Sequence, residues 1–349
     1  MSRAVLSLTV EPAAARQRLD RFLTALGTWG TRSQVQRLIA QGLVRLDGQP
    51  AKSGAVLRCG QRVDIQPAPA PSPNGVEPAP IPLDVLYEDA WLLVINKPAG
   101  LVVHPAPGNW QGTVVSALLH RWQGRPSDLD PLRPGIVHRL DKDTSGVLLI
   151  AKDAATLADL ARQFRGREVG KEYLALVWGR VREPRGEITG PIGRHPVHRK
   201  RMSVRASGRA AVTRYDVIAQ NAAASLLRVW PRTGRTHQIR VHLATLGHPI
   251  VGDVVYGGRR ARTTETGVRR QALHAASLTF QHPQTGKSVC VTAPLPADMR
   301  QACDDVGLSG LTSRGPSSSV FARNAPRPSD SAPRVLLGQT RSPRYPSPS

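Results

Sequence analysis

The sequence predicts an α+β protein in which a mixed, mainly antiparallel β-sheet forms the larger part and a small α/β unit precedes it. Over residues 84–305, short strand-like runs outnumber helical stretches, and the two do not alternate as in a doubly wound fold. The clearest strand-like runs lie at 92–95, 147–151, 173–177 and 225–230. The clearest helical stretches lie at 113–121, 154–165 and 237–246. With 349 residues, 40% of them apolar, the chain can bury a substantial core.

Residues 1–66 predict a compact unit of two helices and a short sheet. Apolar residues at helical spacing place the first helix over 18–26. The second helix begins near Ser33, which together with Gln36 resembles a capping box, and it ends at Gly42. Two short strands follow, with a tight Asp-Gly turn after the first, at 43–46 and 62–65.

Two segments outside these units have a different composition. Residues 67–83 are rich in proline without any period, which predicts an extended linker between the small unit and the large unit at 84–305. Residues 306–349 are dominated by Ser, Pro and Arg and contain few apolar residues. Such a segment buries too little apolar surface to offset chain entropy, so we expect a disordered basic tail.

The surplus of basic residues indicates a polyanionic partner. The 48 Lys and Arg residues outnumber the 25 Asp and Glu residues and give a formal net charge of +23, which fits a nucleic acid or an anionic membrane surface. No apolar run approaches the length of about 18 residues needed to span a bilayer, and the run at 4–10 is too short for a secretory signal. The three isolated cysteines (Cys59, Cys290 and Cys303) predict a reduced, cytoplasmic protein.

The stretch GIVHRLDKDTSGVLLIAK at 135–152 places charged residues on a loop between two apolar runs. The order of acidic residues from Asp141 onward imitates the start of an EF-hand loop. The twelfth position of such a loop must be an acidic ligand, but here it is Lys152, so calcium binding is rejected. Asp141 is either a catalytic carboxylate or a surface carboxylate paired with Arg139 or Lys142.

Two further stretches carry candidate functional groups. KEYLALVWG at 171–179 places Tyr173 near the start of a strand, where it either packs in the core or stacks on a base. PRTGRTHQIRVHLATLGHP at 231–249 predicts a helix that starts near a glycine turn, with Arg240 on the flank of its apolar face. The basic groups at this helix start either bind an anion or supply a guanidinium to a buried carboxylate.

Taken in order, HRLDKDTSG, KEYLA and GRTHQIRVH resemble the RluA/RluD-type pseudouridine synthases. The blocks INKPAGLVVHP, PIGRHP, VGDVVYGG and QALHAASLTFQHP agree with this family. In the N-terminal unit, RLDRFL, SQVQRLIAQGLVRLDGQ and GQRVDI resemble an S4 domain, a small RNA-binding module. The resemblance spans about 18–305 and implies a pseudouridine synthase catalytic domain that follows an S4 domain.

The resemblance implies a role for each of the candidate catalytic residues. Members of the family isomerise uridine in RNA to pseudouridine, which breaks the N-glycosidic bond and forms a carbon–carbon bond at C5. Asp141 matches the essential aspartate, Arg240 matches its partner, with Arg235 as the alternative, and Tyr173 matches the tyrosine that packs against the flipped base. A carboxylate can stabilise or trap the oxocarbenium-like sugar. Attack on the sugar and removal of its C2′ proton both stay open, and no cofactor is implied.

The resemblance and the basic segments together predict the RNA contacts. Arg139 would fill the gap that the uridine leaves when it flips out of the stack. The basic loop at 194–202 is expected to contact phosphates, as is the exposed face of the second helix. The other predicted contacts are His138, Arg235, His237, Arg32, Arg37, Arg199 and Lys200.

No metal site is predicted, because the closely spaced histidines at 195–198 and 237–242 have no Cys or acidic ligand at suitable spacing. An S4 domain together with the PIGRHP block resembles the RluD-type branch, so the expected substrate is large-subunit rRNA. Two alternatives are an enzyme of the same fold that acts on tRNA and a noncatalytic ribosome-assembly factor. The second would have lost Asp141 or Tyr173, yet both are present. We expect the protein to act as a monomer.

Overall fold

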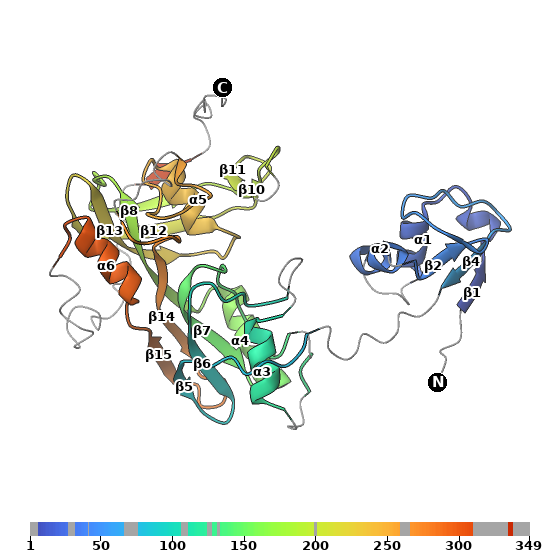
Figure 1. Cartoon of the computed structure of the whole chain (residues 1–349), viewed down its shortest axis with the longest axis horizontal. Helices are drawn as coiled ribbons and strands as arrows, with labels where there is room; N and C mark the ends of the chain where they lie inside the picture. Colours follow the sequence, from blue (N-terminus) through green and yellow to red (C-terminus); the bar gives the residue numbers. More distant parts are fainter. Residues whose placement is uncertain are drawn as a thin grey trace. The chain divides into compact units, whose positions relative to one another are not determined.

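The chain folds into two compact units, 1–75 and 76–349 (Figure 1). The computed structural model describes residues 6–26, 32–40, 42–65, 76–105, 111–123, 128–130, 133–198, 201–258, 266–309 and 334–337. Each unit has a hydrophobic core of its own. Within these described ranges, no helix combines the length and apolar character that crossing a membrane requires.

The smaller unit is a four-stranded sheet, in the order β1-β4-β2-β3, that packs against two helices. Its elements are β1 (Leu6–Thr9), a 3-10 turn (Pro12–Ala14), α1 (Leu19–Ala25), α2 (Arg32–Ala40), β2 (Val44–Leu46), β3 (Gln49–Pro50) and β4 (Arg62–Ile65). Both predicted helices are present and bury apolar side chains such as Leu19 and Val35. The tight turn is also present: Asp47 and Gly48 have φ values of 51° and 79°, which suit a two-residue hairpin turn.

The larger unit is built on a ten-stranded sheet in the order β16-β9-β12-β13-β8-β14-β7-β6-β5, with β15 paired to β14. The strands are β5 (Val85–Glu88), β6 (Leu92–Lys97), β7 (Ser145–Ala151), β8 (Gly170–Trp178), β9 (Arg185–Thr189), β12 (Val212–Gln220), β13 (Ala224–Pro231), β14 (Leu273–Gln281), β15 (Ser288–Thr292) and β16 (Arg334–Leu336). The hairpin of β10 (Ile192–Arg194) and β11 (Met202–Val204) is separate. The helices are α3 (Val114–Arg121), α4 (Ala154–Gly166), α5 (Gln238–Thr245) and α6 (Ala297–Asp305).

The predicted fold class is confirmed, because neighbouring strands of the large sheet pair antiparallel at all but two places. The parallel pairs are β7 with β14 and β9 with β16. Every strand-like run and helical stretch singled out from the sequence is a strand or helix of the structure, with ends that differ by at most a few residues.

The segments predicted as linker and tail are partly packed. Val76 is buried, and the Ala79 N–H donates to the Ser116 carbonyl at 3.0 Å, so the second half of the 67–83 segment lies on the larger unit. The prediction of a wholly disordered tail from 306 is wrong at two places. Leu308 is apolar and buried in the core, and residues 334–336 add β16 to the edge of β9.

Strand β7 is buried along its whole length. Leu148 and Ile150 pack into one core cluster together with side chains of α3. The alternate residues Val147 and Leu149 are buried as well, because they pack against a second cluster that includes Leu160 of α4. Helices therefore cover both faces of the strand that follows the loop carrying Asp141.

A row of residues in register runs across the middle strands of the sheet. Val229, Tyr173, Ala275, Gly146 and Lys97 are successive partners on β13, β8, β14, β7 and β6. Gly146 allows this close approach: it has φ +114°, and a Cβ on it would lie 2.1 Å from the Ala275 carbonyl oxygen. Only glycine adopts this conformation without strain.

Lys97 anchors the 138–144 loop from the neighbouring strand. Its side chain is completely buried, and Nζ donates to the carbonyls of Pro98, Leu101 and Lys142 at 2.8, 2.9 and 3.0 Å. Burial lowers the pKa of Lys97 to about 7, and the nearby carboxylate of Asp143 opposes this shift. The three carbonyls match the three N–H groups of an ammonium, so the whole donor capacity of this lysine is used to hold backbone.

Further hydrogen bonds fix the same loop from the opposite side. Arg270 donates to the Asp143 carbonyl at 3.2 Å, and two bonds of 2.6 and 2.8 Å to Asp298 hold its guanidinium in place. The amide of Gln271 donates to the Thr144 hydroxyl at 3.3 Å. The loop is therefore tied to β6 and to the segment before β14, and its side chains are presented from a rigid support.

We expect Gly146→Ala to lower the free energy of unfolding by about 3 kcal/mol or more, because it combines a strained φ with overlap against the Ala275 carbonyl. Urea denaturation measures the change. Gly286→Ala is the matched control: it also has positive φ (+66°) but open space around the new Cβ, so about 1 kcal/mol is expected. Equal losses in the two variants would show that the contact with β14 does not matter.

We expect Lys97→Met to lower the free energy of unfolding by about 3 kcal/mol, because it leaves three carbonyls without their buried donor. The exposed Lys287 provides the control, and Lys287→Met should change stability by no more than about 0.5 kcal/mol. Denaturant titration of both variants tests this, and a Lys97→Met protein as stable as the wild type would refute the anchoring role.

Candidate active site

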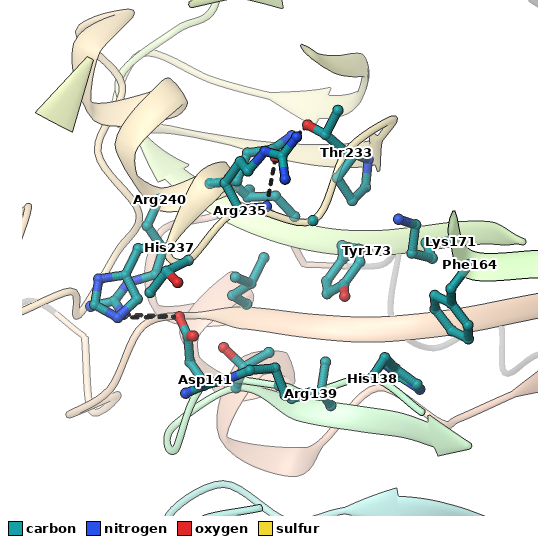
Figure 2. Close-up of a pocket in the computed structure, with 18 of the residues that line it drawn as sticks. His138, Arg139, Asp141, Phe164, Lys171, Tyr173, Thr233, Arg235, His237 and Arg240 are labelled. Carbon is teal, nitrogen blue, oxygen red and sulfur yellow. Dashed lines mark hydrogen bonds and ion pairs between the residues drawn. The ribbon is translucent and has the colours of Figure 1, made fainter. Parts of the chain in front are cut away.

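A cavity of about 400 Å³ lies where three segments of the larger unit meet (Figure 2). One wall is the loop that leads into β7, a second is β8, and the third is the connection from β13 into α5. Figure 2 shows Asp141 and Arg139 on the first of these segments and Arg235, His237 and Arg240 on the third, with Tyr173 between them. The three stretches that the sequence singled out thus surround one cavity.

Asp141 is held by a buried arginine that bridges two carboxylates. Arg240 donates from Nη1 to Asp141 Oδ2 at 3.1 Å. Its Nε and Nη2 donate to the two carboxylate oxygens of Asp253 at 2.7 and 3.0 Å. Asp253 is completely buried, whereas 19% of the Asp141 side chain is exposed to the cavity. The pairing of Arg240 with Asp141, which the family resemblance implied, is therefore present in the structure.

The charge of Arg240 is secured despite its burial. Burial lowers the pKa of its guanidinium, but the hydrogen bonds and charges of Asp253 and Asp141 outweigh this and raise the pKa above its usual value. A lysine in place of Arg240 could not form the same contacts. Its single ammonium group cannot donate two parallel hydrogen bonds to the carboxylate of Asp253 and also reach Asp141. The second carboxylate, Asp253, was not identified from the sequence.

The two oxygens of Asp141 have different surroundings. Oδ2 receives the Arg240 bond and lies 3.8 Å from Nε2 of His237. No hydrogen bond from the described part of the chain reaches Oδ1. One oxygen is therefore fixed by the protein, and the other is left for a molecule in the cavity.

The start of α5 is pinned by buried polar side chains. Gln238 donates to the Val212 carbonyl and to the Thr213 hydroxyl, both at 3.0 Å, and accepts from Thr233 at 2.6 Å. His242, one turn later, is bonded to the same Thr213 hydroxyl at 2.9 Å. These bonds tie the helix to β12. Because the helix is fixed, Arg240 in its first turn points at Asp141.

Tyr173 faces the cavity from β8 and also packs against two of the core clusters of the larger unit. Burial raises the pKa of its hydroxyl, and the charge of Asp141 adds to the shift. At neutral pH the phenol is therefore protonated. The sequence left two interpretations of Tyr173 open, a core residue and a stacking partner for a base. Its position fits both.

The His138 side chain contacts other parts of the protein and supports the fold. Its Nε2 accepts the backbone N–H of Leu149 at 3.0 Å, and its ring stacks on Phe164 at a centroid distance of 4.9 Å. Burial lowers the pKa of the imidazole to about 3, so the ring is neutral and does not bring a charge to RNA. His138 lines the cavity and at the same time holds the loop against β7.

A group of basic side chains lies along the cavity. Arg139 and Arg165 are exposed, whereas Arg235 and Lys171 are half-buried. Burial lowers the pKa of Lys171, and the charge of Arg167 lowers it further. Within the described ranges, neither Arg139, Arg165 nor Lys171 forms an ion pair.

Lys171 was not recognised as a candidate from the sequence. A signal was present, because residues two apart on a strand face the same side, and Lys171 precedes Tyr173 by two positions. Figure 2 shows both side chains on the same wall of the cavity.

Some predicted RNA contacts cannot be placed. Arg32 and Arg37 belong to α2, but their side chains lie outside the described part, as do Arg199 and Lys200 entirely. The neighbouring basic hairpin, β10–β11, contributes Arg201, whose guanidinium stacks near the Tyr256 ring and donates to the Val255 carbonyl. Among described residues, no group of three or more His, Cys, Asp or Glu side chains is arranged to hold a metal ion.

The chain is similar to known proteins over most of its length. A family model described as RNA pseudouridylate synthase matches residues 91–245, and an S4 domain model matches residues 17–63. The chain is 44% identical over 298 residues to the ribosomal large subunit pseudouridine synthase D of Nitrosomonas europaea, covering 84% of this chain and 86% of the relative. It is 49% identical over 293 residues to an uncharacterized RNA pseudouridine synthase of Chloroflexus aurantiacus, covering 84% and 91%.

Solved structures are similar as well. Human RNA pseudouridylate synthase domain containing 4 matches with a TM-score of 0.52 and 26% identity, covering 64% of this chain and 92% of that one. Human RNA pseudouridylate synthase domain containing 1 matches with a TM-score of 0.50 and 31% identity, covering 62% and 84%. The sequence identity to full-length relatives, the S4 domain and the fold lead to one conclusion: the chain is an isomerase that belongs to the RNA pseudouridine synthase family.

Proposed function

We propose that this enzyme converts uridine in large-subunit rRNA to pseudouridine and that Asp141 is its catalytic carboxylate. The observation that carries the catalytic assignment is the position of Asp141: it faces the cavity, its Oδ2 is fixed by Arg240, and its Oδ1 has no hydrogen bond from the described residues. The rRNA assignment is supported by the similarity to the ribosomal large subunit pseudouridine synthase D of Nitrosomonas europaea.

The reaction breaks the bond between N1 of the base and C1′ of the ribose, and it then joins C1′ to C5. Positive charge develops on the sugar as the base leaves, and an ionised carboxylate stabilises it. The guanidinium of Arg240 donates to Asp141 Oδ2 at 3.1 Å and so holds the carboxylate at the cavity. Oδ1 can either attack C1′ or accept the C2′ proton, and both routes start from this oxygen.

Tyr173 is proposed to pack against the detached uracil while it turns to present C5. Its side chain lines the cavity next to the Asp141 loop, and its phenol stays protonated because of its raised pKa. A protonated phenol can donate a hydrogen bond to the base without adding a negative charge near Asp141. The proton that leaves C5 has to be accepted by another group or by water.

Arg139 is proposed to take the place of the flipped uridine in the RNA stack. It is exposed, lies two residues before Asp141 and forms no ion pair in the described structure, so its guanidinium is available. A planar cation can stack on the exposed neighbouring bases and offset part of the cost of flipping.

Three basic groups along the cavity are proposed to bind the phosphates that flank the target. Arg165, Lys171 and Arg235 all line the cavity, and an anion bound among them would reduce the repulsion between their like charges. The S4 domain is proposed to add RNA contacts of its own, largely through the backbone.

Asp141→Asn is expected to lower kcat on the order of 10⁴-fold while RNA binding is retained, because the amide has the shape of the carboxylate but not its charge. Conversion of uridine in large-subunit rRNA transcripts measures this. Asp143→Asn is the control, since this neighbour anchors the loop through its carbonyl, and its activity should stay within about threefold. Equal activity of wild type and Asp141→Asn would remove Asp141 from the mechanism.

The same assay on tRNA transcripts tests the substrate class. Conversion of rRNA with little conversion of tRNA is the expected result. Conversion of tRNA alone would favour the alternative of a tRNA-modifying enzyme, and no conversion of either by a folded wild type would favour a noncatalytic RNA-binding protein.

Lys171→Met is expected to raise KM about fivefold and to leave kcat within about twofold, because the lost contact is to phosphate and not to the reacting atoms. In addition, the slope of log affinity against log salt concentration should decrease by about 0.7, the value for one phosphate contact on a single strand. Lys287→Met should change neither quantity. An unchanged salt dependence in Lys171→Met would contradict a phosphate contact at this position.

A further inference from the structure

Tyr256 contacts three residues that lie around the proposed catalytic carboxylate: His237, Arg240 and Asp253. It follows α5 in the segment that also carries Asp253, and its N–H donates to Asp253 Oδ1 at 3.0 Å. Two guanidinium groups lie over its ring, that of Arg240 at 5.1 Å and that of Arg201 at 5.6 Å from the ring centroid. Cations over the face of an aromatic ring are attracted to it, so both contacts help to hold the ring.

The hydroxyl of Tyr256 connects two segments. It accepts the backbone N–H of Met202 in β11 at 2.8 Å, and it lies 2.9 Å from Nδ1 of His237. The His237 ring meets the Tyr256 ring edge-on, with a centroid distance of 5.7 Å and an interplanar angle of 80°. On its other side, His237 Nε2 lies 3.8 Å from Oδ2 of Asp141.

His237 itself has an unusual backbone. It has φ +55° and ψ 21°, the left-handed region, directly before the first residue of α5. A residue other than glycine adopts this conformation at a cost, and such residues gather at functional sites. The conformation turns the imidazole toward Asp141 (Figure 2).

The proton on the imidazole can be assigned from these contacts. Burial lowers the pKa of His237, so the ring is neutral at neutral pH and carries one N–H. Because the Tyr256 oxygen already accepts from Met202, its own O–H is free to donate to Nδ1. This leaves the N–H at Nε2, facing the carboxylate. The other tautomer would leave the O–H without an acceptor and turn a lone pair toward Asp141.

We infer that Tyr256 is a positioning residue which, through His237, directs an N–H at the catalytic carboxylate and keeps it oriented. The hydroxyl holds His237 in the Nε2–H tautomer. The imidazole and Arg240 then both face Oδ2, so Oδ1 stays turned to the substrate. The series of contacts that ends at Asp141 begins in the basic hairpin β10–β11, where the Met202 N–H donates to the Tyr256 hydroxyl. The inference rests on the proposed catalytic role of Asp141.

The test combines NMR with kinetics. With histidine labelled with ¹⁵N, the shifts of the two ring nitrogens report the tautomer of His237, and a His237→Gln sample assigns the signal. The expected result is an N–H on Nε2 in the wild type and a loss of this preference in Tyr256→Phe. An N–H on Nδ1 in the wild type would overturn the inference whatever the activity of the protein.

Tyr256→Phe is expected to lower kcat about tenfold, the effect of about one neutral hydrogen bond, with KM within about twofold. Tyr87→Phe is the matched control, because it removes a hydroxyl bonded to Asp89 at 2.7 Å that lies outside the cavity, and its kcat should be unchanged. Wild-type kcat with a retained tautomer in a folded Tyr256→Phe protein would overturn the inference. Full activity of Asp141→Asn would instead refute the catalytic role, while the tautomer measurement would still decide what Tyr256 does.

Discussion

The candidate active site depends on one buried guanidinium. Arg240 is placed between a carboxylate with no exposure and one that faces the cavity. An isolated charge at this depth would be strongly unfavourable, and the bidentate pair with Asp253 makes it tolerable. Asp253 thus stabilises the cation, and the cation in turn holds Asp141 through a hydrogen bond to Oδ2. Removing Arg240 or Asp253 would leave the other as a buried charge without its bidentate partner, so the three groups function as a unit.

Most of the secondary structure could be predicted because local patterns determine it. The run 147–151 reads as a strand from its composition, and β7 includes it. The three stretches of the candidate site were identified by their motifs, and the structure places Asp141, Tyr173 and Arg240 around one cavity. What a pattern cannot supply is the distance between residues that lie 99 positions apart, such as Asp141 and Arg240.

Burial of the side chain is the physical reason why some residues were missed in the sequence and others were given a different role. A lysine in a sequence looks like a surface residue, yet Lys97 is buried with three carbonyl acceptors that only the folded chain brings together. Conversely, His138 looks like a group for RNA, but its ring nitrogen is occupied by the Leu149 N–H. Leu308 and the strand at 334–336 show that a few apolar residues in a polar tail are enough for local packing.

The position of β14 has a consequence for how this protein is made. It lies between β7 and β8, which are neighbours in sequence but not in the sheet. A nascent chain that ends before residue 273 therefore has no strand to join the segment carrying Asp141 to the one carrying Tyr173. The candidate active site is therefore completed late in translation, and incomplete products released from the ribosome would lack it.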